Sequence, residues 1–325
     1  MRVVVMEDYQ GIVERLPCFG RASGHEIVVH SHRPLDAAER AGQIGEAEAV
    51  ILIRERTPVD RELLEQLPRL RLICQTGRGL PHIDLAECTR RGIVVCNGSG
   101  SPQAPAELTL ALILAASRRI VEDAVALRNG VWQTTVGREL HGKTLGIVGY
   151  GSIGALVARY GVALGMSVLA WGREGSLSRA AADGHVAESD LDALFTRSDV
   201  VSLHLKLSPE TRGLVSAARL ALMKQDALLV NTARAGLVEA GALEHALSTG
   251  RPGQVAIDVF DEEPAPPGPL LQHANVLATP HLGYVTWETY DAYFAEAFAQ
   301  LDAFAAGTPV GVVNPEILGI AEIDA

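Results

Sequence analysis

The chain has 325 residues, enough for about two domains of ordinary size, and this length excludes a peptide module or a small disulfide scaffold. Hydrophobic residues make up 48% and charged residues 21%, a composition of globular rather than disordered or fibrous proteins. The 28 lysines and arginines against 39 aspartates and glutamates leave a formal charge of −11, and no basic block is present. Nucleic acid and anionic membranes are therefore not expected partners.

The N-terminus and the cysteines indicate the compartment. An acidic pair follows only four apolar residues after Arg2, which is too short for the core of a signal peptide. The longest apolar stretch, 108–116, falls short of the ~18 residues that a membrane span needs. The four cysteines form no C-x-x-C pair and have no zinc-ligand spacing, so we expect free thiols and no metal. These features predict a soluble protein of the cytoplasm.

Short β-branched runs alternate with helical patterns from residue 2 to about 97. Such alternation gives a parallel sheet with helices on both sides. A cluster of Gly, Ser and Pro over 97–102, followed by Pro105, has the composition of a linker and precedes a strongly apolar helix over 107–117. The expected strands of this first series are 3–6, 26–30, 49–53, 70–74 and 93–96.

A second alternating series begins after a polar loop over 130–143. Six strands with helices between them form a complete doubly wound sheet. The residues that follow start as a helix over 288–306 and end in an extended stretch; they are too few for a domain, so we expect them to fold back on the first series. The expected strands of the second series are 145–148, 168–171, 200–204, 228–231, 255–257 and 276–278.

The sequence Gly149-Tyr-Gly-Ser-Ile-Gly154 directly follows the first strand of the second series and leads into a helical pattern. Gly149 permits a tight turn, Gly151 lets the backbone approach a pyrophosphate, and Gly154 lets helix and strand pack closely. Backbone amides at the helix N-terminus, among them those of Ser152 and Ile153, would face the phosphates. The pattern predicts a dinucleotide site, with a glycine-rich turn that binds no ligand as the alternative.

The residues after the second strand of this series bear on the choice of cofactor. A carboxylate there would bind the adenosine ribose of NAD, but the sequence reads Trp171-Gly172-Arg173-Glu174. Gly172 leaves room for a 2′-phosphate and Arg173 could pair with it, so the pattern favours NADP over NAD. Glu174 leaves NAD open, with Arg173 then pointing into solvent.

Polar residues follow four further strands of the second series, at the sheet edge where open α/β sheets bind ligands. These residues are His204, Arg234, Asp258 and His281. Any one of them could be a capping or surface residue. Their placement at the edge that also carries the phosphate loop predicts one shared site.

Several segments together resemble the D-isomer-specific 2-hydroxyacid dehydrogenases, a family that includes phosphoglycerate dehydrogenases and glyoxylate/hydroxypyruvate reductases. The resemblance covers nearly the whole chain. Residues 75–84 look like the family's substrate loop and 104–107 like the start of its interdomain helix. The other segments are 149–154, 231–239, 258–264 and 279–281.

The resemblance implies a catalytic trio of Arg234, Glu263 and His281. Reduction of a 2-keto acid requires a cation for the carboxylate, a hydride donor, and an acid that protonates the carbonyl oxygen. Arg234 supplies a charged fork for the carboxylate. His281 is the acid, or the base in the oxidative direction, and Glu263 would orient its ring and favour the protonated form. Asp261 and Glu262 stand beside Glu263, and only the family match selects among them.

The family also implies contacts to the cofactor. The residue that matches Asp258 contacts the nicotinamide end in family members, and Leu205 is a candidate adenine contact. His204 is interpreted as structural, because the proline that commonly follows one residue later in the family is Lys206 here. The predicted cofactor-binding residues are Gly149, Gly151, Ser152, Ile153, Gly154, Gly172, Arg173, Leu205, Thr232, Ala233 and Asp258.

The predicted substrate-binding residues are Gly77, Arg78, Gly79 and Arg234. The two glycines let backbone amides of the loop form an anion-binding nest. Many relatives have a small or apolar residue in place of Arg78, so we hypothesise that Arg78 reads a second polar or anionic group on the substrate. The alternative is a solvated surface arginine.

Together these features predict two doubly wound parallel-sheet α/β domains. A Rossmann NAD(P)-binding domain over 102–292 would be inserted into a flavodoxin-like substrate domain formed by 1–101 and 293–325. The expected function is hydride transfer between NAD(P)(H) and a small 2-keto acid or D-2-hydroxy acid, and the resemblance implies a homodimer. A corepressor-like protein that senses its cofactor on the same fold is the alternative.

Overall fold

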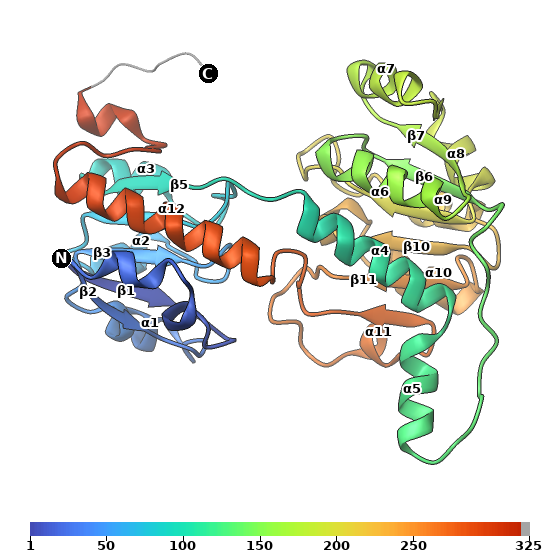
Figure 1. Ribbon diagram of the computed structural model, residues 1–325, viewed down its shortest axis with the longest axis horizontal. Coiled ribbons are helices and arrows are strands. Elements are labelled where there is room, and N and C mark those ends of the chain that lie inside the picture. Colours follow the sequence, from blue (N-terminus) through green and yellow to red (C-terminus); the bar gives the residue numbers. More distant parts are fainter. Residues whose placement is uncertain (320–325) are drawn as a thin grey trace. The chain divides into compact units, whose positions relative to one another are not determined.

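The computed structural model of the protein describes residues 1–319, which divide into two compact units (Figure 1). Unit 1 contains Met1–Gly100 together with the chain from Thr286 onward, and unit 2 contains Ser101–Val285. The return to unit 1 falls at Thr286 rather than near residue 292, because Thr286 caps the helix α12 (Trp287–Ala305) by accepting a hydrogen bond from the amide of Thr289 at 3.2 Å. A boundary at residue 292 would cut through this helix.

The described part of unit 1 is built on a five-stranded parallel sheet in the order β2-β1-β3-β4-β5. This is the flavodoxin-like order, with its topological switch point between β1 and β3. Central strands β3 and β4 are buried throughout, as expected of parallel strands covered on both faces. The strands are β1 (Arg2–Met6), β2 (Glu26–Val29), β3 (Ala49–Leu52), β4 (Leu72–Gln75) and β5 (Val94–Asn97).

Short helices capped by aspartate connect these strands. The side chains of Asp36, Asp60 and Asp84 each accept a hydrogen bond from the backbone amide three residues later, which fixes where the helices begin. They start α1 (Ala37–Ile44), α2 (Arg61–Glu65) and α3 (Leu85–Arg90), which pack on one face of the sheet, while α12 contacts β4. The 3-10 helices are η1 (Val13–Arg15), η2 (Phe19–Ala22) and η4 (Pro315–Leu318), and Val312 pairs with Cys96 in an antiparallel bridge.

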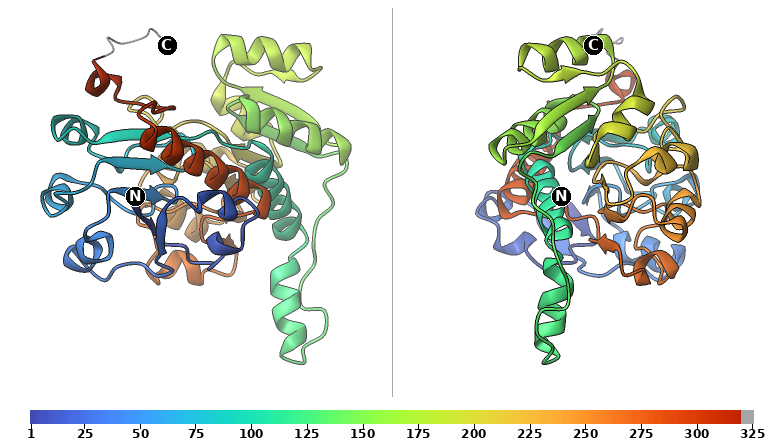
Figure 2. Two further views of the ribbon diagram at one scale, coloured as in Figure 1. Left: turned by 60° about the vertical axis from the view of Figure 1, so that its left-hand side comes forward. Right: turned by 90° about the vertical axis from the view of Figure 1, so that its right-hand side faces the viewer.

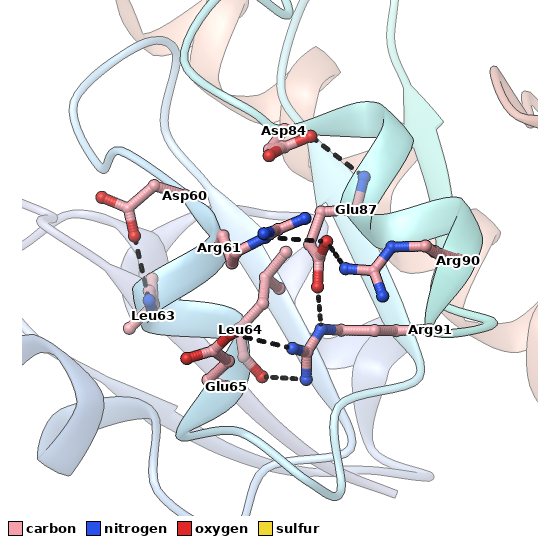
Figure 3. A network of polar contacts seen from close by, with 9 residues as sticks. All are labelled: Asp60, Arg61, Leu63, Leu64, Glu65, Asp84, Glu87, Arg90 and Arg91. Atoms are coloured by element: carbon pink, nitrogen blue, oxygen red, sulfur yellow. Dashed lines mark hydrogen bonds and ion pairs between the residues drawn. The ribbon is translucent and has the colours of Figure 1, made fainter.

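A buried carboxylate joins α2 to α3 (Figure 3). The Glu87 side chain is 2% exposed and meets Nε of Arg61 at 3.3 Å, Nε of Arg91 at 2.5 Å and the guanidinium of Arg90. Arg91 also donates to the carbonyl of Leu64 at 3.2 Å. A carboxylate removed from water needs such paired charges, so Glu87 has a structural role.

Unit 2 contains a seven-stranded parallel sheet in the order β12-β11-β10-β9-β6-β7-β8. The chain runs outward from β6 to β8 and then returns to β9, which is the Rossmann arrangement, with its switch point between β6 and β9. All six predicted strands are present, and β8 is an additional one of two exposed residues at the sheet edge. The strands are β6 (Thr144–Val148), β7 (Ser167–Trp171), β8 (Val186–Ala187), β9 (Val200–Leu203), β10 (Leu228–Asn231), β11 (Gln254–Ile257) and β12 (Val276–Ala278).

Helices cover both faces of this sheet. Alternate residues of one strand enter different cores: Leu228 and Val230 pack with α4 and α6, whereas Leu229 packs with α8, α9 and α10. The fold class predicted from the sequence is thus confirmed in both units. The helices are α4 (Gln103–Ser117), α5 (Ile120–Arg128), α6 (Ser152–Ala163), α7 (Glu174–Ala182), α8 (Leu191–Arg197), α9 (Ala217–Leu222), η3 (Ala235–Leu237), α10 (Ala242–Thr249) and α11 (Pro269–Gln272).

Helix α5 and the first part of the loop after it, residues 120–136, form an arm that extends from the rest of unit 2 (Figures 1 and 2). The chain rejoins unit 2 at Arg138, whose amide donates to the Ser117 carbonyl at 2.7 Å. No residue of α5 is buried. The arm instead exposes large apolar side chains, among them Trp132 at 74% and Val136 at 93%. The others are Ile120, Val121, Val125, Leu127 and Val131.

Three further features concern the cysteines, metals and membranes. Cys18, Cys74, Cys88 and Cys96 are all buried free thiols, as the sequence predicts. Within residues 1–319, no group of three or more His, Cys, Asp or Glu side chains could hold a metal ion. Over the same residues, no helix combines the length and apolar character required to cross a bilayer.

Candidate active site

The phosphate loop lies between β6 and α6, and its three glycines have different surroundings. Gly149 has φ +102°, and a Cβ there would lie 2.9 Å from the backbone of His204 on the neighbouring strand. A Cβ at Gly154 would lie 2.2 Å from the Gly149 carbonyl oxygen, so a side chain would separate helix and strand. At Gly151, by contrast, no heavy atom of the described chain beyond its immediate neighbours lies within 4 Å of a Cβ, so this glycine leaves open space.

That open space meets the N-terminus of α6. The helix begins at Ser152 with Gly151 as its cap, so the amides of Ser152, Ile153 and Gly154 have no helical carbonyl four residues earlier to bond. These amides and the positive end of the helix dipole favour an anion. The residues present fit the pyrophosphate of a dinucleotide.

A second arginine, Arg179 of α7, lies near the carboxyl end of β7 and was not predicted from the sequence as a cofactor contact. Arg173 is exposed and caps α7, and Gly172 lies beside the phosphate loop, since a Cβ there would be 3.7 Å from the amide nitrogen of Tyr150. Arg179 reaches back along α7, and its Nη2 donates to the Tyr150 carbonyl at 3.2 Å and to Ser176 Oγ at 3.1 Å. The sequence indicates this contact only by the spacing of Ser176 and Arg179, three residues apart on the helix that follows the position of a ribose-binding residue.

A histidine and a carboxylate meet beyond β11 and β12. Nδ1 of His281 lies 2.6 Å from Oε2 of Glu263, and Glu263 Oε1 accepts a hydrogen bond from the amide of Phe260 at 3.1 Å. An ionised carboxylate can only accept, so Nδ1 carries the proton in this bond and Nε2 is left for proton exchange with a ligand. His281 itself has φ +53°, a conformation uncommon for residues other than glycine. Tyr284 packs edge-on against the imidazole, with ring centroids 5.4 Å apart.

Asp258 holds the loop that carries His281. Its fully buried carboxylate accepts hydrogen bonds from Thr279 Oγ1 at 2.6 Å, from the Leu282 amide at 2.7 Å and from the Gly283 amide at 2.9 Å. Burial raises the pKa of Asp258 above its ordinary value, although these hydrogen bonds and the nearby His281 oppose the shift. Asp258 is therefore positioned to fix the backbone on both sides of the histidine.

Arg234 follows β10 in a loop that Asn231 holds in place. The buried Asn231 side chain accepts from the Ala233 amide at 3.1 Å and donates to the Arg234 carbonyl at 2.9 Å. Nη1 of Arg234 donates to the Ala233 carbonyl at 2.7 Å. Arg234, Glu263 and His281 thus all stand beyond the carboxyl ends of adjacent strands of one sheet, on the edge that carries the phosphate loop.

The other predicted contacts in unit 2 have the following surroundings. Leu205 packs against the phosphate loop, because its Cδ2 lies 2.9 Å from the position of a Cβ at Gly149. Thr232 Oγ1 lies 2.7 Å from Thr109 Oγ1, and the Thr109 hydroxyl donates a hydrogen bond to the Pro105 carbonyl. The His204 ring lies 2.9 Å from Ser202 Oγ, and burial lowers the pKa of His204 to about 4, which agrees with a structural role.

The predicted substrate residues Gly77, Arg78 and Gly79 belong to unit 1, where they follow β4. Gly77 has φ +73°, and Arg78 is exposed. The structure shows two further residues against this loop, Arg54 and Glu55, which follow the adjacent strand β3. Their proximity to the loop could not be predicted from the sequence, because it depends on the pairing of β3 with β4.

A Rossmann sheet with an open phosphate loop, joined in one chain to a flavodoxin-like unit, defines a two-unit α/β protein of the dinucleotide-binding class. Residues 110–283 match the model of the "D-isomer specific 2-hydroxyacid dehydrogenase, NAD binding domain" family. The chain belongs to this family, as the resemblance in its motifs predicted.

The chain is similar to relatives that are named as two different enzymes. It is 42% identical over 277 residues to the glyoxylate reductase of Aeropyrum pernix, covering 81% of this chain and 82% of that protein. It is 38% identical over 307 residues to the D-3-phosphoglycerate dehydrogenase of Mycobacterium tuberculosis, covering 91% of this chain but only 58% of the length of that protein.

Solved structures extend the similarity to both units. A phosphoglycerate oxidoreductase from Vibrio cholerae O395 aligns with a TM-score of 0.92 at 44% identity, over 94% of this chain and 99% of that one. The D-lactate dehydrogenase of Aquifex aeolicus, solved with NAD and lactic acid, aligns with a TM-score of 0.73 at 29% identity, over 94% and 96% of the two chains.

Proposed function

We propose that the protein is an NAD(P)-dependent oxidoreductase that interconverts a small 2-keto acid and the corresponding D-2-hydroxy acid. The observation that carries this proposal is the His281–Glu263 pair, 2.6 Å apart, at the sheet edge that also holds the phosphate loop. When bound, the reduced nicotinamide supplies the hydride. Family membership and the names of the relatives agree with this chemistry.

Each residue of the trio has a separate task in the proposed reaction. Arg234 binds the substrate carboxylate through its guanidinium fork and so fixes the keto group. Protonated His281 gives its Nε2 proton to the carbonyl oxygen as that oxygen gains charge, and takes it back in the oxidative direction. Glu263 keeps the proton on Nδ1 and stabilises the charged ring. Asp258 holds the histidine loop and, by the family resemblance, also faces the nicotinamide end.

The direct test is the absorbance of the reduced nicotinamide during incubation with glyoxylate, hydroxypyruvate, pyruvate and larger branched or aromatic keto acids. We expect oxidation of the cofactor with at least one of them. If every one of these acids fails while reduced dinucleotide still binds tightly, the enzymatic role is wrong.

We propose NADP as the preferred cofactor. Support comes from Gly172 and Arg173, where no carboxylate is present to repel a 2′-phosphate, and from Arg179 and Ser176 next to them. Arg173 and Arg179 are both exposed, as is the carboxylate of Glu174. A phosphate monoester would be stabilised by charge-assisted hydrogen bonds from the two guanidinium groups.

Replacement of Arg179 by glutamine is expected to raise the Kd of NADPH by about tenfold or more and to leave that of NADH nearly unchanged, since one charge-assisted hydrogen bond is lost. Quenching or enhancement of nicotinamide fluorescence measures both constants. Arg21→Gln, at an exposed position of η2 in unit 1, is the matched control for the change in net charge. Tighter binding of NADH than of NADPH by the unmodified protein would reject the preference.

We propose that Arg78 contacts a polar group on the substrate other than its 2-keto acid. Arg78→Ala should then lower kcat/KM for hydroxypyruvate by about tenfold, the size expected for one lost hydrogen bond to a charged group, with a smaller change for glyoxylate. Measurement of kcat/KM over a panel of keto acids checks this. Equal losses for all acids, or no loss for any of them, would mean that Arg78 is a solvated surface residue.

We propose a homodimer in which the arm, residues 120–136, packs against a second copy. A nine-residue helix with no buried face lacks the packing that ordinarily stabilises a helix of this length. The exposed apolar side chains of the arm are typical of an association surface. Light scattering gives the mass in solution, and Trp132→Asp should lower it to that of a single chain.

A further inference from the structure

Two residues that follow β3, Arg54 and Glu55, form an ion pair that lies against the predicted substrate loop at residues 77–79 of unit 1. Nη1 of Arg54 lies 2.0 Å from the position that a Cβ at Gly77 would take, and Oε1 of Glu55 lies 2.2 Å from that of a Cβ at Gly79. A side chain at either glycine would therefore have to displace one of these two charged groups. Between them, Nη2 of Arg54 and Oε2 of Glu55 are 3.4 Å apart.

The backbone of Arg54 has an unusual conformation and is bonded to the next strand. Arg54 has φ +55°, a left-handed conformation that costs free energy for a residue other than glycine. Its amide donates to Thr76 Oγ1 at 2.9 Å, which ties the end of β3 to the end of β4. The side chains of Arg54 and Glu55 are only 14% and 20% exposed, so salt in the solvent screens them less than it screens surface charges.

The charges around the loop are balanced. Arg54 and Arg78 contribute two positive charges, and Glu55 contributes one negative charge against Gly79. A second carboxylate, Glu296 on α12, accepts a hydrogen bond from the Ser99 amide at 2.7 Å, next to Gly98, whose amide bonds the Gly77 carbonyl. The nearby His82 adds no charge at neutral pH, because burial lowers its pKa to about 4.

We propose that Glu55 is a specificity-determining residue that selects substrates with an uncharged side group and disfavours those with a second anionic group. This inference rests on the proposed function and on the assignment of residues 77–79 to the substrate. A phosphate or second carboxylate brought to the loop would meet the carboxylate of Glu55, which already offsets the guanidinium of Arg54. A hydroxyl or small alkyl group avoids this repulsion and can still contact Arg78.

Hydroxypyruvate and its 3-phosphate ester provide the test, because they differ only in the charged group. The unmodified protein should have the higher kcat/KM with hydroxypyruvate. Glu55→Gln keeps the packing against Gly79 and removes the charge. The ratio of kcat/KM for the phosphate ester to that for hydroxypyruvate should then rise roughly 10- to 100-fold, as expected for one charge at ~5 Å in a partly screened site.

Two controls accompany this variant. Glu62→Gln makes the same change in net charge at an exposed position of α2 and should leave the ratio unchanged. Glu55→Ser repeats the removal of charge with a smaller side chain and replaces the glutamine variant if thermal unfolding shows that the latter does not fold. An unchanged ratio in a folded Glu55 variant, or a preference of the unmodified protein for the phosphate ester, overturns the inference.

A binding measurement separates this inference from the proposed function. Calorimetric titration of the complex with oxidised dinucleotide gives Kd for D-glycerate and for its 3-phosphate without any turnover. Weaker binding of the phosphate by the unmodified protein, relieved in Glu55→Gln, supports the charge selection even if no keto acid is reduced. Equal effects of the substitution on both ligands contradict it even if the protein is an active dehydrogenase.

Discussion

Replacement of His281 by alanine should lower kcat roughly 10²- to 10⁴-fold, the usual contribution of a positioned general acid, while the affinity for reduced dinucleotide stays within about twofold. The imidazole is expected to act on the carbonyl oxygen and not on the phosphates. The loop at Gly149–Gly154 would bind the phosphates, and it follows β6, which three strands separate from β12. Stopped-flow or steady-state absorbance gives kcat, and nicotinamide fluorescence gives the dinucleotide Kd.

The matched control for this prediction is His245→Ala, which removes an exposed histidine from α10 in the same unit. It should leave both constants unchanged. A second variant, Glu263→Gln, keeps the shape of the partner but removes its charge, so kcat should fall because the protonated imidazole loses the carboxylate that stabilises it. Full activity of His281→Ala would exclude the imidazole as the proton donor.

The sheet of unit 2 was predictable because its strands are buried on both faces and therefore form continuous apolar runs. The same reasoning fails at β8, where Val186 and Ala187 are exposed and the strand has no apolar run to identify it. It also fails for α5, whose apolar residues do not face a core of the same chain. Neither segment has the apolar pattern of a strand or helix that packs on a core, so periodicity in the sequence could not identify it.

The candidate site was predictable to the extent that strand ends determine it. The positions of His281, Arg234 and Asp258 follow from the carboxyl ends of three strands, because all strands of the sheet are parallel. The choice of Glu263 over Asp261 and Glu262 required the family resemblance. The structure agrees with that choice by placing Glu263 2.6 Å from the imidazole, while its part in catalysis stays a prediction.

Residues that reach the site from a neighbouring element were the ones that sequence reasoning missed. Arg179 bonds the Tyr150 carbonyl only because α7 runs beside the phosphate loop. Arg54 and Glu55 contact Gly77 and Gly79 only because β3 pairs with β4, and the left-handed conformation of Arg54 has no signal in its residue type. Such contacts depend on strand order, which periodicity does not give.

Replacement of Arg234 by alanine should lower kcat/KM for every 2-keto acid roughly 10²- to 10³-fold, because the substrate carboxylate loses a bidentate charged partner worth a few kcal/mol. The dinucleotide Kd should change little. Steady-state kinetics over several keto acids tests whether the loss is uniform, as expected if Arg234 binds the group that they all share.

The comparison with Arg234→Lys sharpens this prediction. Lysine keeps the charge but replaces a planar fork with a single ammonium, so it can attract the carboxylate without fixing the keto group over the cofactor. We therefore expect partial recovery of KM with kcat still well below that of the unmodified protein. Equal rescue of both constants would mean that Arg234 contributes only charge, and full activity of the alanine variant would remove it from the site. Because Asn231 sets the loop through bonds to the backbone of Ala233 and Arg234, neither substitution should disturb the fold.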